Sequence, residues 1–215
     1  MVSDDVTTAK GRATRGRIVA AAAELMHRHG VAGTSTPAVR DAAGVSSSQI
    51  YHYFADKDAL TRSVIDWWAD RIVGTQVELL ADVEDLAGLR RWRDAVVAGA
   101  GDNGGCPLGG LSSQLAEHAW ARATSATGFH RWQTAISDAL ARLSRLGVLD
   151  PDVDPERCSL ALLAAIQGGL LLGQATGSPR PLEAALDTVL DTLAPFTARS
   201  GAPRRTAPGR SHSPV

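Results

Sequence analysis

Residues 34–60 read TSTPAVRDAAGVSSSQIYHYFADKDAL, and this stretch decides the fold of the chain. Thr36 and the proline after it predict a helix start, because a hydroxyl caps unpaired amides and proline suits the first helical turn. Gly44 predicts the end of this helix in a left-handed residue. Ser46 is then placed to cap a second helix, which extends to about Tyr53. Two short helices joined by a turn that contains glycine form a helix-turn-helix.

The second helix of this pair divides into two faces. Ile50 and Phe54 are four residues apart and lie on one apolar face, whereas most other side chains are small or form hydrogen bonds. This division suits a helix with one side on a core and the other in the DNA major groove. Gln49 can read adenine through N6 and N7, and the serines at 46–48 suit base edges or phosphates. Asp56 then predicts the cap of a third helix.

Residues 15–65 resemble the DNA-binding domain of the TetR (TetR/AcrR) family of transcriptional regulators. The resemblance is carried by AGVSSSQIYHYFADKDAL at 43–60, in which aromatic residues and a lysine follow the turn at the family's offsets. Two places depart from the family pattern. Ser47 and Ser48 stand where a Lys-Gly or similar pair is usual, and Arg40 stands where a small or aliphatic residue is more common.

The resemblance also implies roles for single residues. His52 and Lys57 match family positions that grip phosphates or pack the domain. Tyr51 and Tyr53 match such positions too, although from the residues alone either tyrosine could equally belong to the core. The DNA-binding residues that we predict are Arg15, Thr36, Arg40, Ser46, Ser47, Ser48, Gln49, Tyr51, His52 and Lys57.

Charge is unevenly distributed along the chain. The whole chain carries −1, but residues 10–57 hold seven cations against three anions, a net charge of +4. The rest of the chain is therefore acidic, and this asymmetry predicts a polyanionic partner at one end only. Arg12, Arg15 and Arg17 crowd the amino end of the first helix, where a cation opposes the helix dipole. Phosphate attraction is thus favoured over a merely solvated basic face.

Size and composition are those of a globular protein, since 215 residues with 44% hydrophobic content can bury a core in one large or two small domains. Two cysteines and the absence of a secretory signal favour a cytoplasmic protein with reduced thiols. The apolar run at 160–172 is shorter than the ~20 residues that span a bilayer, so we expect a buried helix there. No metal-ligand spacing is present, and no cofactor is predicted.

Helical spacing recurs along the whole chain, without a strand pattern or an internal repeat. We therefore predict an all-α protein with a helix-turn-helix DNA-binding domain at 9–55, a larger helical ligand-binding and dimerisation domain at 56–198, and a disordered tail at 199–215. The first helix is expected to end at Gly30. The later helices are predicted at 59–82, 85–100, 107–119, 129–146, 156–175 and 182–197, with a loop at 99–105.

The last two predicted helices carry wide apolar faces, and Gly169 and Gly173 are spaced to let helices approach closely. Packing within one chain needs the same residues. However, a single helix-turn-helix binds DNA weakly, and two fixed by symmetry bind much better. A homodimer through these two helices is therefore the favoured interpretation, and the resemblance implies the same.

Most aromatic residues lie outside the helix-turn-helix, in the middle helices. Apolar walls with a few polar groups are typical of a small-molecule site, although aromatics at helical spacing also form plain cores. The sequence CPLGG at 106–110, followed by leucines, is similar to the LmrA/YxaF-like subgroup of the family, which implies a bulky, partly aromatic effector. The predicted ligand-binding residues are Trp67, Leu111, Leu115, His118, Phe129, Trp132, Gln167 and Leu171.

Cys106 and His118 raise the alternative of an enzyme with a cysteine nucleophile. If one helix links them, they lie roughly 18 Å apart at ~1.5 Å per residue, too far for direct pairing. We therefore predict a repressor, not an enzyme. It binds a palindromic double-stranded DNA operator as a homodimer and is released by a small apolar or aromatic effector. A ligand-independent activator or architectural protein is a further alternative.

Overall fold

The computed structural model describes residues 8–100 and 105–193. In these ranges the chain forms nine helices and no strand, which confirms the all-α prediction. The predicted tail at 199–215, and most of the predicted loop at 99–105, lie outside the described residues. The helices are α1 (Ala9–Gly33), α2 (Thr36–Ala43), α3 (Ser47–Tyr53), α4 (Lys57–Ala81), α5 (Leu86–Gly99), α6 (Pro107–Gln114), α7 (Ala119–Arg145), α8 (Pro155–Thr176) and α9 (Arg180–Leu193).

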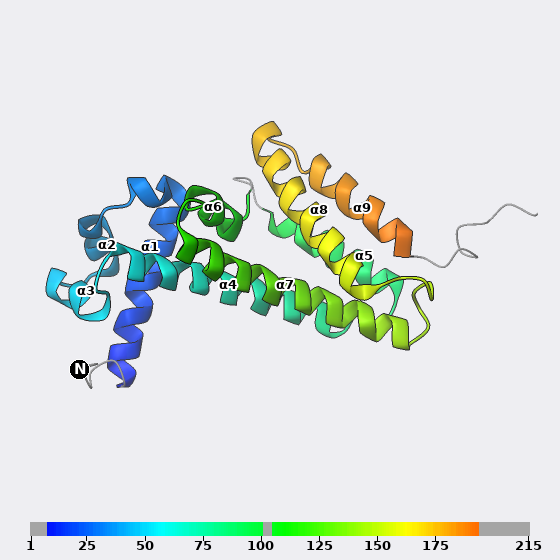
Figure 1. Ribbon diagram of the computed structural model, residues 1–215, viewed down its shortest axis with the longest axis horizontal. Coiled ribbons are helices and arrows are strands. Elements are labelled where there is room, and N and C mark those ends of the chain that lie inside the picture. Colours follow the sequence, from blue (N-terminus) through cyan, green and yellow to red (C-terminus); the bar gives the residue numbers. More distant parts are fainter. Residues whose placement is uncertain (1–7, 101–104, 194–215) are drawn as a thin grey trace, which may run out of the picture.

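The molecule is elongated, with α1–α3 at one end and the α8–α9 pair towards the other (Figure 1). Helices α4 and α7 run side by side along the length between them, and this is the most extensive helix–helix contact of the described residues. Helix α4 starts in the helix-turn-helix and continues without a break past α6 to α5. One rigid element therefore belongs to both ends of the molecule.

The helix-turn-helix forms with one correction to its predicted start. The cap of α2 is Ser35, whose Oγ accepts from the Ala38 N–H at 3.3 Å, whereas Thr36 is the first helical residue. Ser35 has the extended backbone that a cap requires, and a proline at the second helical position fits equally well. Gly44 ends α2 in the left-handed region at φ 63°, as predicted.

The first helix is broken at Gly30, as predicted, but the chain turns once more before it ends. Gly30 has φ 73°, and helical residues continue after it to Gly33. The Thr34 hydroxyl donates to the Gly30 carbonyl at 2.8 Å and closes this last turn. The result is a kinked corner from which α2 starts.

Helix α7 is the largest difference from the sequence prediction, because it begins at Ala119 rather than at Phe129. Its first turns contain threonine, serine and Gly128, a composition that is typical of a loop. Thr124 and Thr127 instead donate to the carbonyls one turn earlier. Gly128 lies against α4, where a Cβ would meet the Ala69 Cβ at 2.9 Å. Tertiary packing therefore overrides local propensity here.

Two clusters of buried side chains form the core. One joins α1–α3 with the first half of α4, α6 and the start of α7. The other joins the end of α4 with α5, α7, α8 and α9. The first cluster includes Leu108 and Leu111 of α6, so residues beyond the predicted boundary at 55/56 help to bury the helix-turn-helix. The domain boundaries themselves stay a prediction.

Helix α8 is longer than the apolar run read from the sequence. It spans 22 residues with a mean hydropathy of 1.6 in its most apolar window, so by length and composition alone it could cross a membrane. The sequence predicts instead that the apolar run at 160–172 is too short to span a bilayer. The helix extends the run at both ends, and only 28% of that window is buried within the described chain. An apolar surface on α8 is therefore left exposed.

The closest approach of α8 and α9 occurs at Gly169. A Cβ added there would lie 2.5 Å from the Leu182 Cα, which is backbone and cannot move aside. We expect Gly169→Ala to lower the free energy of unfolding by roughly 1–3 kcal/mol, as overpacking does. Gly16→Ala is the control, because Gly16 is exposed within α1 with no atom near its missing Cβ, and it should gain about 0.5–1 kcal/mol. Urea unfolding of both variants measures the difference, and equal effects would contradict the close approach.

Candidate nucleic-acid interface and cavities

Helix α3 presents a polar face at the end of the molecule (Figure 1). Ile50 and Phe54 are each only 3% exposed and anchor the helix to the core. Ser47, Ser48, Gln49 and His52 are exposed, and Tyr51 is 64% exposed, the most of any large hydrophobic side chain in this helix. The predicted division into a core face and a solvent face is confirmed. Tyr53, half-buried, packs against the core and meets His52 edge to face at 4.9 Å.

A capping box sets the start of α3. The Ser46 Oγ accepts from the Gln49 N–H at 3.2 Å, and the Gln49 Oε1 accepts from the Ser46 N–H at 2.9 Å. The Ser46 hydroxyl also meets the Ser48 hydroxyl at 2.8 Å. Adenine recognition uses both the oxygen and the nitrogen of a glutamine amide. In this state the oxygen of Gln49 is engaged, so only its amide N–H groups face outward for a base.

All three lysine and arginine side chains among the predicted DNA-binding residues have partners within the chain. Arg15 donates to the Ser63 hydroxyl at 2.7 Å, and its guanidinium lies over the Phe54 ring at 5.2 Å. Lys57 donates to the Val31 carbonyl at 2.7 Å, and Arg40 pairs with its neighbour Asp41 at 2.6 Å. Arg15 and Lys57 therefore join α1 to α4, a role that charge alone did not predict.

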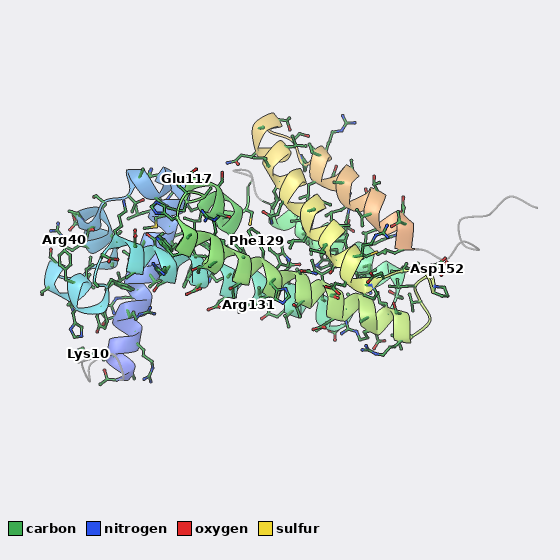
Figure 2. All side chains as sticks on the ribbon, viewed as in Figure 1. Lys10, Arg40, Glu117, Phe129, Arg131 and Asp152 are labelled. Carbon is green, nitrogen blue, oxygen red and sulfur yellow. The ribbon has the colours of Figure 1, made fainter. Side chains whose placement is uncertain are left out.

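Other predicted residues lie around this end. Thr36 is half-buried in the first turn of α2. Lys10 and Arg17 are exposed on the first turns of α1, and Figure 2 shows Lys10 and Arg40 at the end of the molecule that carries α3. Exposed cations beside a polar helix face are what phosphates on either side of a groove require.

The backbone of Val31 is held from two sides at the α1 corner. Its N–H donates to the Gln114 Oε1 at 2.8 Å, and its carbonyl accepts from Lys57. Gln114 is the last residue of α6, so this is a direct contact between the helix-turn-helix and the rest of the protein. Gly30 stands at this corner with φ 73°, a conformation that favours glycine, and a Cβ there would also meet the same Oε1 at 2.9 Å. Nothing in the sequence pattern marks this contact.

Two cavities lie on either side of the chain at 105–107. The tryptophan cavity, of about 520 Å³, is bounded by α4, α5, α7 and α8 and includes Trp68 and Trp132. The α6 cavity, of about 730 Å³, is bounded by α1, α6, α7 and α8. Both volumes fall in the range of small-molecule sites. Gly105, Cys106 and Pro107 line both.

The structure distributes the predicted ligand-binding residues unevenly. Trp132 lines the tryptophan cavity, whereas Leu111, Phe129, Gln167 and Leu171 line the α6 cavity. The remaining three line neither cavity. Trp67 packs against Trp68 and lies under Arg71, Leu115 is buried in the core of the helix-turn-helix, and His118 is exposed beside Trp120. Sequence reasoning missed Trp68, because the helical phase of two adjacent tryptophans cannot be read from spacing.

Cys106 lies where the two cavities meet. Its Sγ accepts from the Gly109 N–H at 3.4 Å and caps α6, and burial raises the pKa of the thiol. His118 lines neither cavity and lies on the surface just before α7. Because α6 ends at Gln114, no single helix links His118 to Cys106. The thiol is neutral at pH 7 and acts as part of an apolar wall.

The outward face of α8 is apolar from Leu160 to Ala175. Leu160, Leu171 and Leu172 are 51%, 65% and 55% exposed. Ala164, Gly168 and Ala175 are exposed between and beside them at helical spacing. We call these six residues the α8 stripe. The inward face, with Leu162, Leu163 and Ile166, packs on the core, and Leu171 belongs both to the stripe and to the wall of the α6 cavity.

Both parts of the chain match known families. Residues 18–64 match the model "Bacterial regulatory proteins, tetR family", and residues 86–189 match "Tetracyclin repressor-like, C-terminal domain". The narrower LmrA/YxaF-like resemblance of the second part stays a prediction.

The chain is similar over most of its length to proteins of known sequence or structure. It is 30% identical over 203 residues to the HTH-type transcriptional regulatory protein RaaS of Mycobacterium tuberculosis, covering 84% of each chain. It is 29% identical to an uncharacterized HTH-type transcriptional regulator of Lactococcus lactis subsp. lactis, covering 82% of this chain and 91% of the relative. A TetR transcriptional regulator from Chloroflexus aurantiacus superposes with a TM-score of 0.73 at 25% identity, covering 86% and 96%.

The capping box makes a prediction about two adjacent serines. Ser46→Ala removes the acceptor for the Gln49 N–H and should lower the free energy of unfolding by about 1 kcal/mol. Ser47→Ala is the matched control, because Ser47 is the first residue within the helix and is exposed. Loss of the Ser47 hydroxyl should change the free energy of unfolding by no more than a few tenths of a kcal/mol. Urea unfolding compares them; equal destabilisation would show that Ser46 does not cap α3.

Proposed function

This chain belongs to the TetR family of bacterial transcriptional regulators, and we propose that it is a repressor that a small molecule releases from DNA. The observation that carries the proposal is the placement of three features along one molecule. A polar recognition face lies at one end, an exposed apolar stripe lies on α8, and two cavities lie between them. Each feature supplies one part of a ligand-controlled DNA-binding device.

Helix α3 enters the major groove in this proposal. Ser47, Ser48 and Gln49, exposed at its amino end, reach base edges or nearby phosphates. Tyr51 and His52, exposed one turn later, contact the backbone. Gln49 donates from its amide to a base acceptor while its oxygen stays in the capping box. A bidentate contact to adenine would require the Ser46 N–H to be released.

The α8 stripe is the dimer interface in this proposal. Three leucines that are more than half exposed are unusual on one helix unless a partner covers them. A second copy supplies an identical stripe, so a two-fold axis at α8 buries both, with α9 alongside. Two copies then present two α3 helices, and a palindromic operator has half-sites one turn of duplex apart, ~34–36 Å. The same burial accounts for the membrane-like hydropathy of α8 in a protein that acts on DNA in the cytoplasm.

The effector acts through the corner of α1. Gln114 lines the α6 cavity and also accepts from the Val31 N–H. An occupant of that cavity that moves α6 therefore moves the end of α1, from which the helix-turn-helix starts. Operator affinity falls by as much as the effector prefers the shape that does not fit DNA. An apolar or aromatic effector suits cavities lined by Phe129, Leu171 and Trp132.

Loss of the dimer should abolish tight operator binding. We expect Leu172→Lys to yield monomers, because it places a charge within the apolar interface. Affinity for the palindromic duplex that the wild-type protein selects from a random library should fall about 100-fold or more, as two linked sites become one. Ultracentrifugation and fluorescence anisotropy measure the two effects.

Leu146→Lys is the matched control for this variant. Leu146 is 56% exposed at the end of α7, outside the α8 stripe, and gains the same charge. It should stay dimeric and keep its operator affinity. A Leu172→Lys protein that remains a dimer, or a monomer that binds the palindrome as tightly as the wild type, would refute the proposed interface.

The contact between Gln114 and Val31 should be needed for release but not for effector binding. We expect Gln114→Ala to bind an identified effector about as tightly as the wild type, because the lost hydrogen bond points away from the ligand. Operator release at saturating effector should fall severalfold, because the α6 cavity is uncoupled from α1. Ser113→Ala, on the same turn and lining the same cavity, is the control. Titration by calorimetry and by anisotropy separates the two steps; unchanged release in Gln114→Ala contradicts this route.

A further inference from the structure

Three buried N–H groups around the two cavities have no hydrogen-bond acceptor among the described residues. They are the indole Nε1 of Trp68, the indole Nε1 of Trp132 and the amide Nε2 of Gln167. Trp68 and Trp132 line the tryptophan cavity, and Gln167 lines the α6 cavity. Trp132 is only 4% exposed. A buried donor without a partner is costly, so its position beside a cavity points to a partner that is not part of the chain.

The contrast with Trp92 shows that the fold can pair a buried indole beside the tryptophan cavity, because its acceptor, Gln76, lines that cavity. Trp92 is 1% exposed, and its Nε1 donates to the Gln76 Oε1 at 2.8 Å. Helix α4 thus supplies an acceptor for one tryptophan and none for Trp68 or Trp132. Asp70, a carboxylate on the rim of the tryptophan cavity, is paired with Arg131 at 2.8 Å. Its carboxylate is therefore occupied by a surface ion pair and does not accept from the indoles.

The three unpaired groups are of one chemical kind, since an indole nitrogen and an amide nitrogen only donate. The Oε1 of Gln167 is turned towards Gly109, where it would lie 2.7 Å from an added Cβ, and the same amide lies within hydrogen-bonding reach of the Cys106 thiol. The two indoles are therefore the donors that carry most weight. The rest of the walls is largely apolar, with Ile166 and Leu170 in one cavity and Leu111 in the other. Figure 2 shows Phe129 of the α6 cavity midway along the molecule. The buried part of the site therefore supplies donors and apolar surface, and the carboxylates of Asp70 and Glu78 lie on the exposed rim of the tryptophan cavity.

From this arrangement we propose that the effector is an uncharged, mostly apolar molecule whose polar groups are hydrogen-bond acceptors, such as carbonyl oxygens, received by Trp68, Trp132 and Gln167. This inference rests on the proposed function and specifies the effector class of the same cavities. In this proposal an acceptor atom of the effector near α8 meets Gln167, one near α4 meets Trp68, and one near α7 meets Trp132. Cys106, neutral where the cavities meet, is an apolar surface over which one ligand can extend into both.

Charged ligands fit this donor set less well. An ammonium group would bring further donors and leave all three N–H groups unpaired. A carboxylate would accept from them, but it would lose its hydration among apolar walls, and neutral donors compensate a buried charge only in part. The guanidinium of Arg71, on the rim of the tryptophan cavity, lies over the Trp67 ring at 4.7 Å. A neutral acceptor satisfies the donors without these costs.

Pairs of compounds with one shape and different polarity test the proposal on the full-length protein without DNA. The probes are 9-fluorenone against fluorene and benzophenone against diphenylmethane, titrated into ¹⁵N-labelled protein. We expect each ketone to bind roughly tenfold more tightly than its hydrocarbon, about the effect of one or two hydrogen bonds. The indole N–H resonances of Trp68 and Trp132 should move downfield with the ketones, and that of Trp120, which lines neither cavity, should stay in place.

Conservative variants assign the effect to the donors. Trp132→Phe keeps an aromatic ring and removes the N–H, so it should reduce the preference for the ketone roughly fivefold or more. Trp68→Phe is a second, less buried variant with the same expectation. Trp120→Phe removes an indole N–H near the start of α7, lines neither cavity and should leave the preference unchanged. The wild-type resonances give the same answer without any variant, in case a substitution impairs folding.

The proposal is overturned if no ketone in the panel binds better than its hydrocarbon, or if ketones bind without moving either indole resonance. These outcomes are separate from a failure of the proposed function. A compound that releases the operator although ketones show no preference refutes the acceptor chemistry alone. Ketones that shift both indoles but never change operator affinity confirm that chemistry and refute ligand-controlled repression.

Discussion

The backbone of Val31 is the point on which communication along this molecule depends. Its carbonyl accepts from Lys57, the first residue of α4, and its N–H donates to Gln114, the last residue of α6. The carbonyl also accepts from the Thr34 N–H at 3.3 Å, so both polar backbone groups of this residue are paired. A shift of α6 relative to α4 therefore strains the two side-chain bonds that hold the end of α1.

The helix that carries Gln114 is suited to move. Helix α6 has eight residues, two of them glycine, and its cap is the sulfur of Cys106, a weak acceptor. Helices α4 and α7, by contrast, have 25 and 27 residues and pack along each other. The α6 cavity thus has a rigid wall at α7 and a less stable one at α6. Strain from an occupant is relieved at the wall that is connected to the helix-turn-helix.

The sequence predicted well where structure is local. Gly44, Ser46 and Asp56 act as expected, because a stop or a cap depends only on the next few residues. The start of α7 was missed because contact between Gly128 and α4 is not visible in sequence spacing. The same limit applies to the site: the sequence predicts Trp67 and not Trp68 as a cavity residue, and it does not reveal the contacts by which Arg15 and Lys57 join α1 to α4. Their partners, Ser63 and Val31, are brought near by tertiary packing.

Adjacent glycines in α8 show how one helix serves two surfaces. Gly169 faces α9, where the Leu182 backbone leaves no room for a side chain, and Gly173 lies near the Ser178 carbonyl. The two glycines whose spacing was considered for a dimer contact thus serve packing within one chain. Gly168, one residue earlier, is exposed with nothing near it and belongs to the α8 stripe. In the proposed dimer, a small residue there allows two α8 helices to cross closely while the flanking leucines are buried. A helix apolar on both faces is then explained by two protein neighbours, one from each chain.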